Sequence, residues 1–241
     1  MANHHHQRLD GLKVQRTAAK TRLMVEELRS FVSSMRFPEA TPRKQLSAAL
    51  LMASMEHAEA VAFLLEHGPH YHGMPAMALV RPQIECFLRG VFFHSDATTD
   101  QEVMDFIEHD ELPKRADCDG KKRSVSLAQM EEVATQAFSE ISQQLSRAPL
   151  SRLFAFSPKE LHGLVHGGAE VVMLYKINSS SLGFNASDQE LLALLGSSGM
   201  IAGYAMSYLA ARIARDPGNE PPTLREAHDA FREEILASPS S

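Results

Sequence analysis

Apolar residues recur at three- and four-residue spacing through most of the chain, which is the pattern of helices with one buried face. Residues 43–67 show this spacing most clearly, and it stops at Gly68-Pro69. Proline disfavours helical backbone in the residue before it, so this pair predicts the end of a helix. The same reasoning predicts helices at residues 8–35, 43–67, 75–93, 98–113, 126–147, 157–175 and 188–215, and an eighth from residue 223.

The segments between these helices are short and polar, and no stretch shows the apolar–polar alternation of a strand. The connections at residues 112–125 and 176–187 are therefore predicted to be loops. The expected fold class is all-α, a bundle of seven to eight helices in a single domain, residues 1–241. Within it, residues 1–40 would form an N-terminal arm helix and residues 217–241 a peripheral C-terminal helix and tail.

Three helix starts carry a capping box, in which Ser or Thr is followed three residues later by Glu. They begin at Ser157, Ser187 and Thr223. The helix after Ser187 has no charged residue from 191 to 211, so it is expected to be central and buried. A membrane span is the alternative, but flanking basic clusters and a second span are missing, so no membrane is expected. Gly199 and Gly203, four residues apart, would let another helix approach closely.

The composition limits which binding partners and which cellular compartment we expect. Hydrophobic residues make up 44% of the chain and charged residues 22%, as in soluble globular proteins. The net charge of −6 disfavours nucleic-acid binding except through a local basic patch. Lys114, Arg115 and residues 121–123 form the cluster that would follow a nucleic-acid backbone. The two cysteines, Cys86 and Cys118, form no disulfide framework, which favours a reducing, cytoplasmic location.

The helix predicted for residues 157–175 carries two histidines and three glycines near its middle. On a helical wheel, His162, His166 and Glu170 form a stripe beside the apolar face, each one turn from the next. A glycine inside a helix is less favourable than alanine by about 1 kcal/mol, so three of them imply close approach by another helix or by a ligand. The three positions are Gly163, Gly167 and Gly168.

A second predicted helix, residues 75–93, has a similar stripe formed by Arg81, Glu85 and Arg89. An Arg–Glu–Arg ladder on a solvated surface would explain the same spacing, with about 0.3–0.5 kcal/mol for each pair. The apolar face beside the stripe instead favours partial burial. If the apolar faces of the two helices pack together, Arg81, Glu85 and His166 converge.

Two chemistries fit a pair of histidines four residues apart. A zinc site of the His-Glu-x-x-His type needs glutamate after the first histidine, and Gly163 stands there. Arginine beside histidine suits phosphate esters, because arginine holds a phosphate through two hydrogen bonds while histidine moves a proton. We therefore expect a site without metal or cofactor. The predicted catalytic residues are His166, Arg81, Glu85, Arg89 and His162, and the predicted ligand-binding residues are Gly163, Gly167, Gly168 and Glu170.

These residues fall in motifs that resemble a family of uncharacterised bacterial proteins. Its members share an Arg-Pro-x-x-Glu-x-x-x-Arg-Gly helix, a Glu-Leu-Pro-Lys turn and a His-Gly-Gly segment. The matching stretches are residues 81–90, 111–114 and 166–168. The resemblance spans about residues 45–210 and implies an architecture more than an activity.

More distantly, the chain is similar to HEPN-like helical domains, which include ribonucleases of toxin–antitoxin and phage-defence systems. Those enzymes carry an Arg-x(4–6)-His motif on one helix at a dimer interface. This chain departs from that motif, since Arg152 lies ten residues before His162. The arginine would therefore come from another helix, as Arg81 or Arg89. The resemblance implies a homodimeric, metal-independent ribonuclease that acts on RNA and has an antitoxin or defence partner.

A non-enzymatic function would explain the same residues. Arg81, Glu85 and His166 would then form an internal polar network that fixes the register of the helices, and the protein would act by association. A small-ligand pocket beside the glycines is a third interpretation.

Overall fold

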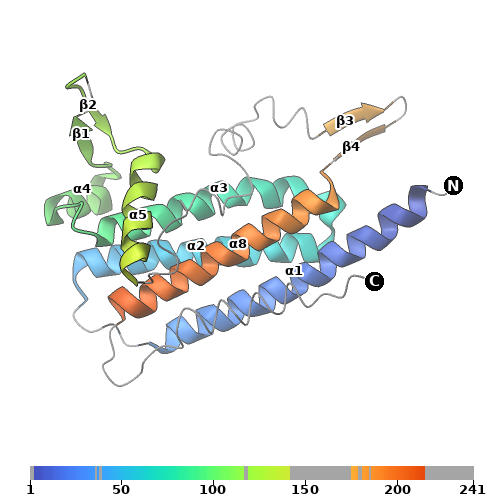
Figure 1. The fold of residues 1–241 in the computed structure, drawn as a ribbon, viewed down its shortest axis with the longest axis horizontal. Coiled ribbons are helices and arrows are strands. Elements are labelled where there is room, and N and C mark those ends of the chain that lie inside the picture. Colours follow the sequence, from blue (N-terminus) through green and yellow to red (C-terminus); the bar gives the residue numbers. More distant parts are fainter. Residues whose placement is uncertain are drawn as a thin grey trace.

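The computed structural model describes residues 3–35, 37, 40–116, 119–141, 175–178, 181–184 and 186–214. Four long helices lie side by side along the longest axis of the molecule (Figure 1). They are α1 (Asn3–Ser34), α2 (Pro42–His67), α3 (Pro69–His94) and α8 (Asp188–Tyr208). The shorter helices α4 (Asp100–His109) and α5 (Leu127–Ile141) lie at one end, and the π-helical turn η2 (Leu209–Ile213) extends α8.

The all-α prediction is confirmed, since the described residues are mostly helical and form six α-helices. The helices predicted at 43–67 and 188–215 correspond closely to α2 and to α8 with η2. The helix predicted from residue 223 and nearly all of the one at 157–175 fall outside the described residues. The expected count of seven to eight helices therefore stays a prediction.

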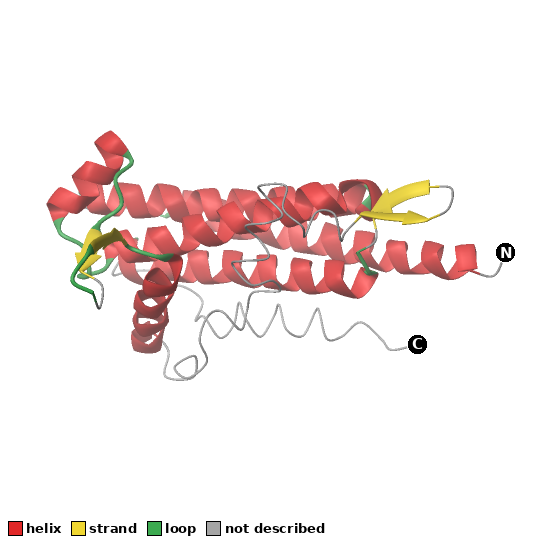
Figure 2. Ribbon diagram, turned by 90° about the horizontal axis from the view of Figure 1, so that it is seen from above, coloured by secondary structure: helices red, strands yellow, loops and turns green. Residues whose placement is uncertain are grey.

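The prediction that the chain contains no strands is wrong. The two presumed loops each contain a two-stranded antiparallel hairpin, seen at opposite ends of the bundle in Figures 1 and 2. The hairpins are β1 (Lys114–Ala116) with β2 (Lys122–Ser124), and β3 (Tyr175–Asn178) with β4 (Ser181–Phe184). Strands of three or four residues are too short to show alternation, and the basic residues of the first hairpin have low strand propensity. Tyr175, expected to end a helix, instead begins β3.

Helix α3 begins six residues earlier than the sequence predicts, because Gly68-Pro69 both ends one helix and starts the next. The carbonyl of Gly68 already accepts hydrogen bonds from the N–H groups of Tyr71 and His72. Pro69 occupies the first turn of α3, where its missing N–H leaves no helical hydrogen bond unmade. Gly68 has φ 153°, a backbone angle that side-chain-bearing residues rarely adopt, so the chain reverses there without another linking residue.

Helix α1 packs along α2 and α8 rather than standing apart as an arm. Its inward side chains recur at alternating spacings of four and three, the seam of helices that pack nearly parallel. The fully or almost fully buried ones are Val14, Ala18, Thr21, Val25 and Val32. Ion pairs from Arg22 to Glu66 and from Arg29 to Glu59 flank this seam. Only the N-terminal end of α1 projects beyond the neighbouring helices in Figure 2.

Helix α8 lies at the centre of the described bundle, in contact with α1, α2 and α3, as its uncharged sequence predicts. The predicted capping box is confirmed, since Ser187 and Glu190 exchange side-chain and backbone hydrogen bonds. By length and composition α2 and the 188–213 segment could each cross a membrane, so the expectation that a second candidate span is missing is wrong. Buried helices of soluble proteins pass the same test, and 72% of the apolar window in 188–213 lies inside the bundle.

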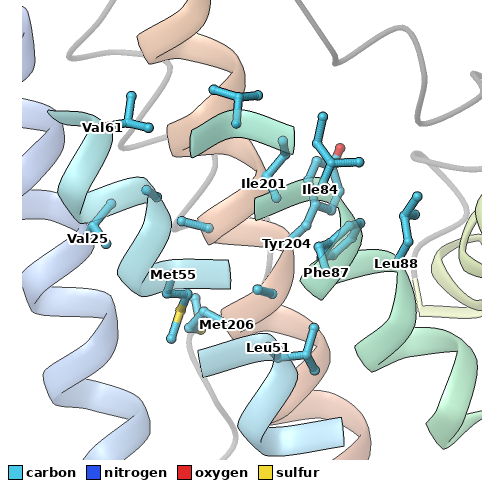
Figure 3. Packing of buried hydrophobic residues seen from close by; sticks show 14 of the residues in the cluster. Val25, Leu51, Met55, Val61, Ile84, Phe87, Leu88, Ile201, Tyr204 and Met206 are labelled. Atoms are coloured by element: carbon cyan, nitrogen blue, oxygen red, sulfur yellow. The ribbon is translucent and has the colours of Figure 1, made fainter. Parts of the chain in front are cut away.

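The core is a continuous cluster of aliphatic and aromatic side chains from α1, α2, α3, α5 and α8. Figure 3 shows Leu51 and Met55 of α2 near Met206 of α8, with Phe87 of α3 beside Tyr204. Leu51, Met55 and Phe87 are at most 1% exposed. Burying a side chain of this size contributes about 1.5–3 kcal/mol, so the cluster supplies the main driving force for assembly.

Helices α2 and α3 approach each other closely at Gly90. A methyl group added there would lie 2.7 Å from the Leu51 side chain and 3.3 Å from its backbone nitrogen. The hydroxyl of Ser47 donates a 2.6 Å hydrogen bond to the Gly90 carbonyl across the same contact. Gly203 was expected to permit such an approach, but in the described part of the chain no atom beyond its own helix backbone lies within 4 Å of the position that its Cβ would take.

The connection between α3 and α4 is held by Arg43 of α2. Its guanidinium donates hydrogen bonds to the carbonyls of Phe93, Ser95 and Thr98, at 2.8 to 3.0 Å. It also pairs with Asp100 in the first turn of α4 at 2.8 Å. These bonds satisfy carbonyls that the end of α3 leaves open, and they fix α4 relative to α3.

We expect Gly90→Ala to lower the free energy of unfolding by about 1–3 kcal/mol, because the new methyl group overlaps Leu51. Gly196→Ala is the matched control, since it also lies within a helix but has open space at its side-chain position. It should raise the free energy of unfolding by about 0.5–1 kcal/mol through helix propensity. Chemical denaturation of both variants measures the difference, and equal stabilisation by both would contradict the close contact.

Candidate functional site

The predicted stripe of α3 is present and partly buried. The Nε of Arg81 donates a 2.8 Å hydrogen bond to one oxygen of Glu85, and Arg89 Nη2 lies 3.4 Å from the other oxygen. The three side chains are 22%, 21% and 28% exposed, in chain order. One carboxylate is thus shared by two guanidiniums, and the cluster keeps one net positive charge near the surface.

Arg89 is also held by an aromatic side chain of α4. The central carbon of its guanidinium lies 6.0 Å from the ring centroid of Phe106, within the range of a cation–π contact. The Phe106 ring in turn packs on Phe93 with centroids 4.5 Å apart. The Nε of Arg89 is buried without a hydrogen-bond partner in the described part of the chain. A buried N–H without a hydrogen-bond partner is unfavourable, so a hydrogen bond from this Nε to a ligand or a water molecule would be favourable.

The other predicted site residues cannot be placed. They are His162, Gly163, His166, Gly167, Gly168 and Glu170, and all of them lie outside the described residues. The convergence of His166 with Arg81 and Glu85 therefore remains a prediction. The structure brings together the three members of the α3 stripe, which the sequence already placed on one helix.

The polar link between helices is made by Gln83, which the sequence analysis did not single out. Gln83 is fully buried, and its Nε2 donates to the Ser198 carbonyl at 2.8 Å while Ser198 Oγ donates to its Oε1 at 2.7 Å. The Gln83 carbonyl accepts a 3.0 Å hydrogen bond from Ser54. A polar residue between Val80 and Phe87 on the apolar face was the available signal.

Two sets of residues on α3 make different contacts: one set binds neighbouring helices, and the other pairs within α3. Gln83 joins α3 to α2 and α8. The ion pairs of Arg81 and Arg89 with Glu85 run within α3 itself. Among the described residues, the stripe is therefore not what fixes the register of the helices.

A second polar pair that the sequence analysis missed lies at the C-terminal end of α3. The Nδ1 of His94 lies 3.1 Å from the Tyr208 hydroxyl, and the two rings meet edge to face at 89°. Burial, and then the charges of Arg43, Lys44 and Arg212, lower the pKa of His94 to about 4, although Asp96 opposes this. Burial raises the pKa of Tyr208 to about 12. Both groups are thus neutral at pH 7.

Among the described residues, the titratable groups near the stripe offer no activated nucleophile and no metal site. Cys86 is half-buried beside the stripe, and burial raises the pKa of its thiol, so the weakly nucleophilic neutral form prevails at pH 7. No group of three or more His, Cys, Asp or Glu side chains in the described ranges could hold a metal ion. The chemistry of the described site is therefore that of the two guanidiniums.

We expect Gln83→Met to lower the free energy of unfolding by about 1–3 kcal/mol, because it leaves the Ser198 hydroxyl buried without its acceptor. Adding Ser198→Ala should recover part of this loss, since both buried polar groups are then absent. Chemical denaturation of the two single variants and the double variant measures the coupling. Strictly additive losses would show that the two side chains do not depend on each other.

The low pKa of His94 predicts a loss of stability in mild acid. Because its folded-state pKa of about 4 lies below the ordinary value of 6.5, the unfolded chain binds more protons between these values, and stability falls as the pH falls through this window. Thermal melting of wild type and His94→Gln at pH 7 and pH 5 tests this. The decrease in Tm should be smaller in the variant, and an equal decrease in both proteins would exclude His94 as a cause.

Comparison with known proteins gives a family but no relative of known activity. No curated protein and no solved structure matches the chain. A family model described as a family of unknown function (DUF6988) matches residues 51–236. The matched region begins at the Leu51 contact with Gly90 and includes the α3 stripe, both hairpins and α8. Since it covers well over half of the chain, the protein belongs to the DUF6988 family.

Proposed function

We propose that the Arg81–Glu85–Arg89 cluster binds a phosphate group of RNA, and that the protein is a metal-independent, HEPN-like ribonuclease with His166 as its proton-transfer residue. The observation that supports this most is the pair of half-buried guanidiniums that share one carboxylate. The cluster stays positively charged in a chain whose net charge is −6. Such a site attracts an anion more strongly than a neutralised ladder would.

Arginine suits this ligand because its planar guanidinium matches two phosphate oxygens. Glu85 pairs with only one nitrogen of each arginine, the Nε of Arg81 and a terminal nitrogen of Arg89. The remaining nitrogens provide donors for a phosphate. Partial burial lowers the local dielectric constant and strengthens each of these bonds relative to the same pair in water.

The proposed reaction is attack of the ribose 2′-hydroxyl on the adjacent phosphorus. His166 removes the 2′ proton, the new O2′–P bond forms, and the P–O5′ bond breaks. The leaving 5′ oxygen takes a proton from His162, one turn earlier in the predicted helix. Arg81 and Arg89 stabilise the additional negative charge on the phosphate, while Glu85 orients them. The products are a 2′,3′-cyclic phosphate and a 5′-hydroxyl end, and no metal or cofactor takes part.

The glycines of the same segment would give this ligand room. Gly163, Gly167 and Gly168 have no side chain to keep a nucleotide from the backbone, and Glu170 would lie a turn beyond His166. As in the ribonucleases that it resembles, we propose that the protein is a bacterial cytoplasmic homodimer restrained by an antitoxin or defence partner.

In the non-enzymatic alternative, Arg81, Glu85 and His166 would fix the register of the helices. Gln83, Ser54 and Ser198 make such a connection between α2, α3 and α8. Among the described residues the register thus has another contributor, and this supports a ligand-binding function for the stripe.

The test is incubation of the purified protein with total RNA in excess EDTA. Wild type should cleave it, and His166→Ala should be slower by about 10²–10⁴-fold with an unchanged Tm, because a proton-transfer group contributes this much to rate. Arg81→Gln should also slow cleavage, by weakening phosphate binding. His109→Ala, an exposed histidine at the end of α4, is the matched control and should retain full activity.

Two results would reject the proposed reaction. One is cleavage that persists undiminished in His166→Ala, and the other is cleavage that stops when EDTA is added. A marked fall in the Tm of His166→Ala without any cleavage by wild type would instead favour the structural network, since loss of a buried partner destabilises by about 1–3 kcal/mol.

A further inference from the structure

We propose that the β1–β2 hairpin is a second nucleic-acid-binding element, which holds the phosphodiester backbone of single-stranded RNA beside the α3 stripe. In Figure 1 the hairpin projects from the bundle near α4 and α5. The proposal goes beyond the proposed function, because the hairpin would bind RNA whether or not the protein cleaves it.

The hairpin concentrates positive charge. Residues 114–124 contain five basic and two acidic residues, a net charge of +3 in a chain of net charge −6. Every residue of β2 is exposed, as are Lys114 and Lys121. The hairpin buries little of its own surface, so its sequence is not explained by a contribution to the core. An anionic partner would explain it.

The strand register places these charges on both faces of the hairpin. Arg115 lies directly opposite Arg123, and like charges in that position destabilise a strand pair. Lys114 and Lys122 belong to the flanking pairs, so they share the other face. Arg115 is paired with Glu102 and Lys114 with Glu111, so a phosphate backbone would contact mainly the exposed side chains of β2.

The base of the hairpin is fixed to the bundle. The Arg115 guanidinium donates two hydrogen bonds to Glu102 of α4 and a third, of 2.8 Å, to the Ala97 carbonyl. The N–H of Val125 donates to the Pro113 carbonyl at 2.8 Å, and both residues are buried. The hairpin is therefore held at a defined place on α4 while the Lys122 and Arg123 side chains stay exposed.

The hairpin is also continuous with the α3 stripe through one face of α4. Glu102, which holds Arg115, and Phe106, which lies beneath Arg89, are four residues apart and so one above the other on that helix. Arg81 and Arg89 are eight residues apart, about 12 Å along α3. The stripe alone is therefore longer than one phosphate needs, and the hairpin is fixed to the same helix, α4, that contacts the stripe, which suits a chain of several nucleotides.

The form of this surface favours a single strand over a membrane or double-helical RNA. Residues 114–124 contain no aromatic or large aliphatic side chain that could insert into a membrane or read a base. The deep, narrow major groove of double-helical RNA would not admit a two-stranded ribbon. Binding through charge alone, without sequence preference, is the expected mode.

The experiment measures binding of a fluorescein-labelled 2′-O-methyl oligouridine, which lacks the 2′-hydroxyl and is not cleaved by the proposed reaction. One variant carries Lys121→Gln, Lys122→Gln and Arg123→Gln. The matched control carries Lys13→Gln, Arg16→Gln and Lys20→Gln on the exposed side of α1. Each variant loses two lysines and one arginine, so both have the same net charge.

We expect the hairpin variant to bind about 10–100-fold more weakly at 0.1 M KCl. Its plot of log affinity against log salt should be shallower by about 2, since each phosphate contact to a single strand contributes about 0.7 to the slope. The control should keep the wild-type affinity and slope. Equal Tm values for all three proteins would show that folding is unaffected.

Three results would overturn the proposal. They are a wild type that does not bind the oligonucleotide, a hairpin variant that keeps the wild-type affinity and slope, and binding of polyglutamate or phosphatidylserine vesicles as tight as that of the oligonucleotide. Failure of the ribonuclease is distinguishable, because absence of cleavage together with hairpin-dependent binding would reject only the reaction.

Discussion

The close contact between α2 and α3 at Gly90 is the constraint on which the rest of the described structure depends. With Leu51 against Gly90 and Ser47 bonded to its carbonyl, the rotation of α3 about its own axis is fixed. That rotation places Gln83 inside the bundle, facing Ser198 of α8. A different rotation would either bury the guanidiniums of the stripe, which is very unfavourable for charged groups, or expose Phe87.

The same contact determines what lies beside the stripe. Because Arg43 of α2 binds the last carbonyls of α3 and the first turn of α4, the path of the chain after α3 is set by α2. Phe106 then meets Arg89, and Glu102 one turn earlier meets Arg115. The stripe and the basic hairpin are thus adjacent for reasons of packing, although 25 residues separate Arg89 from Lys114.

Much of this arrangement could be predicted from the sequence, and the exceptions have physical causes. Periodicity predicted the helices, because one buried face dictates which positions are apolar, and the uncharged run at 191–211 predicted the burial of α8. It could not give the hairpins, whose strands of three or four residues are too short to show alternation, and of which β1–β2 is fixed by contacts at its base. It also misplaced the start of α3, since Gly68-Pro69 marks both the end of α2 and the beginning of α3. The α3 stripe was predicted because its members share one helix, whereas the role of Gln83 depends on Ser198, 115 residues away.

The distribution of charge explains why an acidic chain can hold a basic surface. Glutamates of α2 pair with arginines of α1 on another part of the bundle, as Arg22 with Glu66 and Arg29 with Glu56 show. A phosphate at the hairpin interacts mainly with charges within about 10 Å at 0.1 M salt, since more distant ones are screened. The net charge of −6 therefore weakens long-range attraction of RNA, whereas the acidic groups that contact the hairpin are already paired with basic ones, Glu102 with Arg115 and Glu111 with Lys114. In the proposed complex with RNA, the whole-chain charge would govern how fast the ligand arrives, while Lys114, Lys122 and Arg123 would govern how tightly it is held.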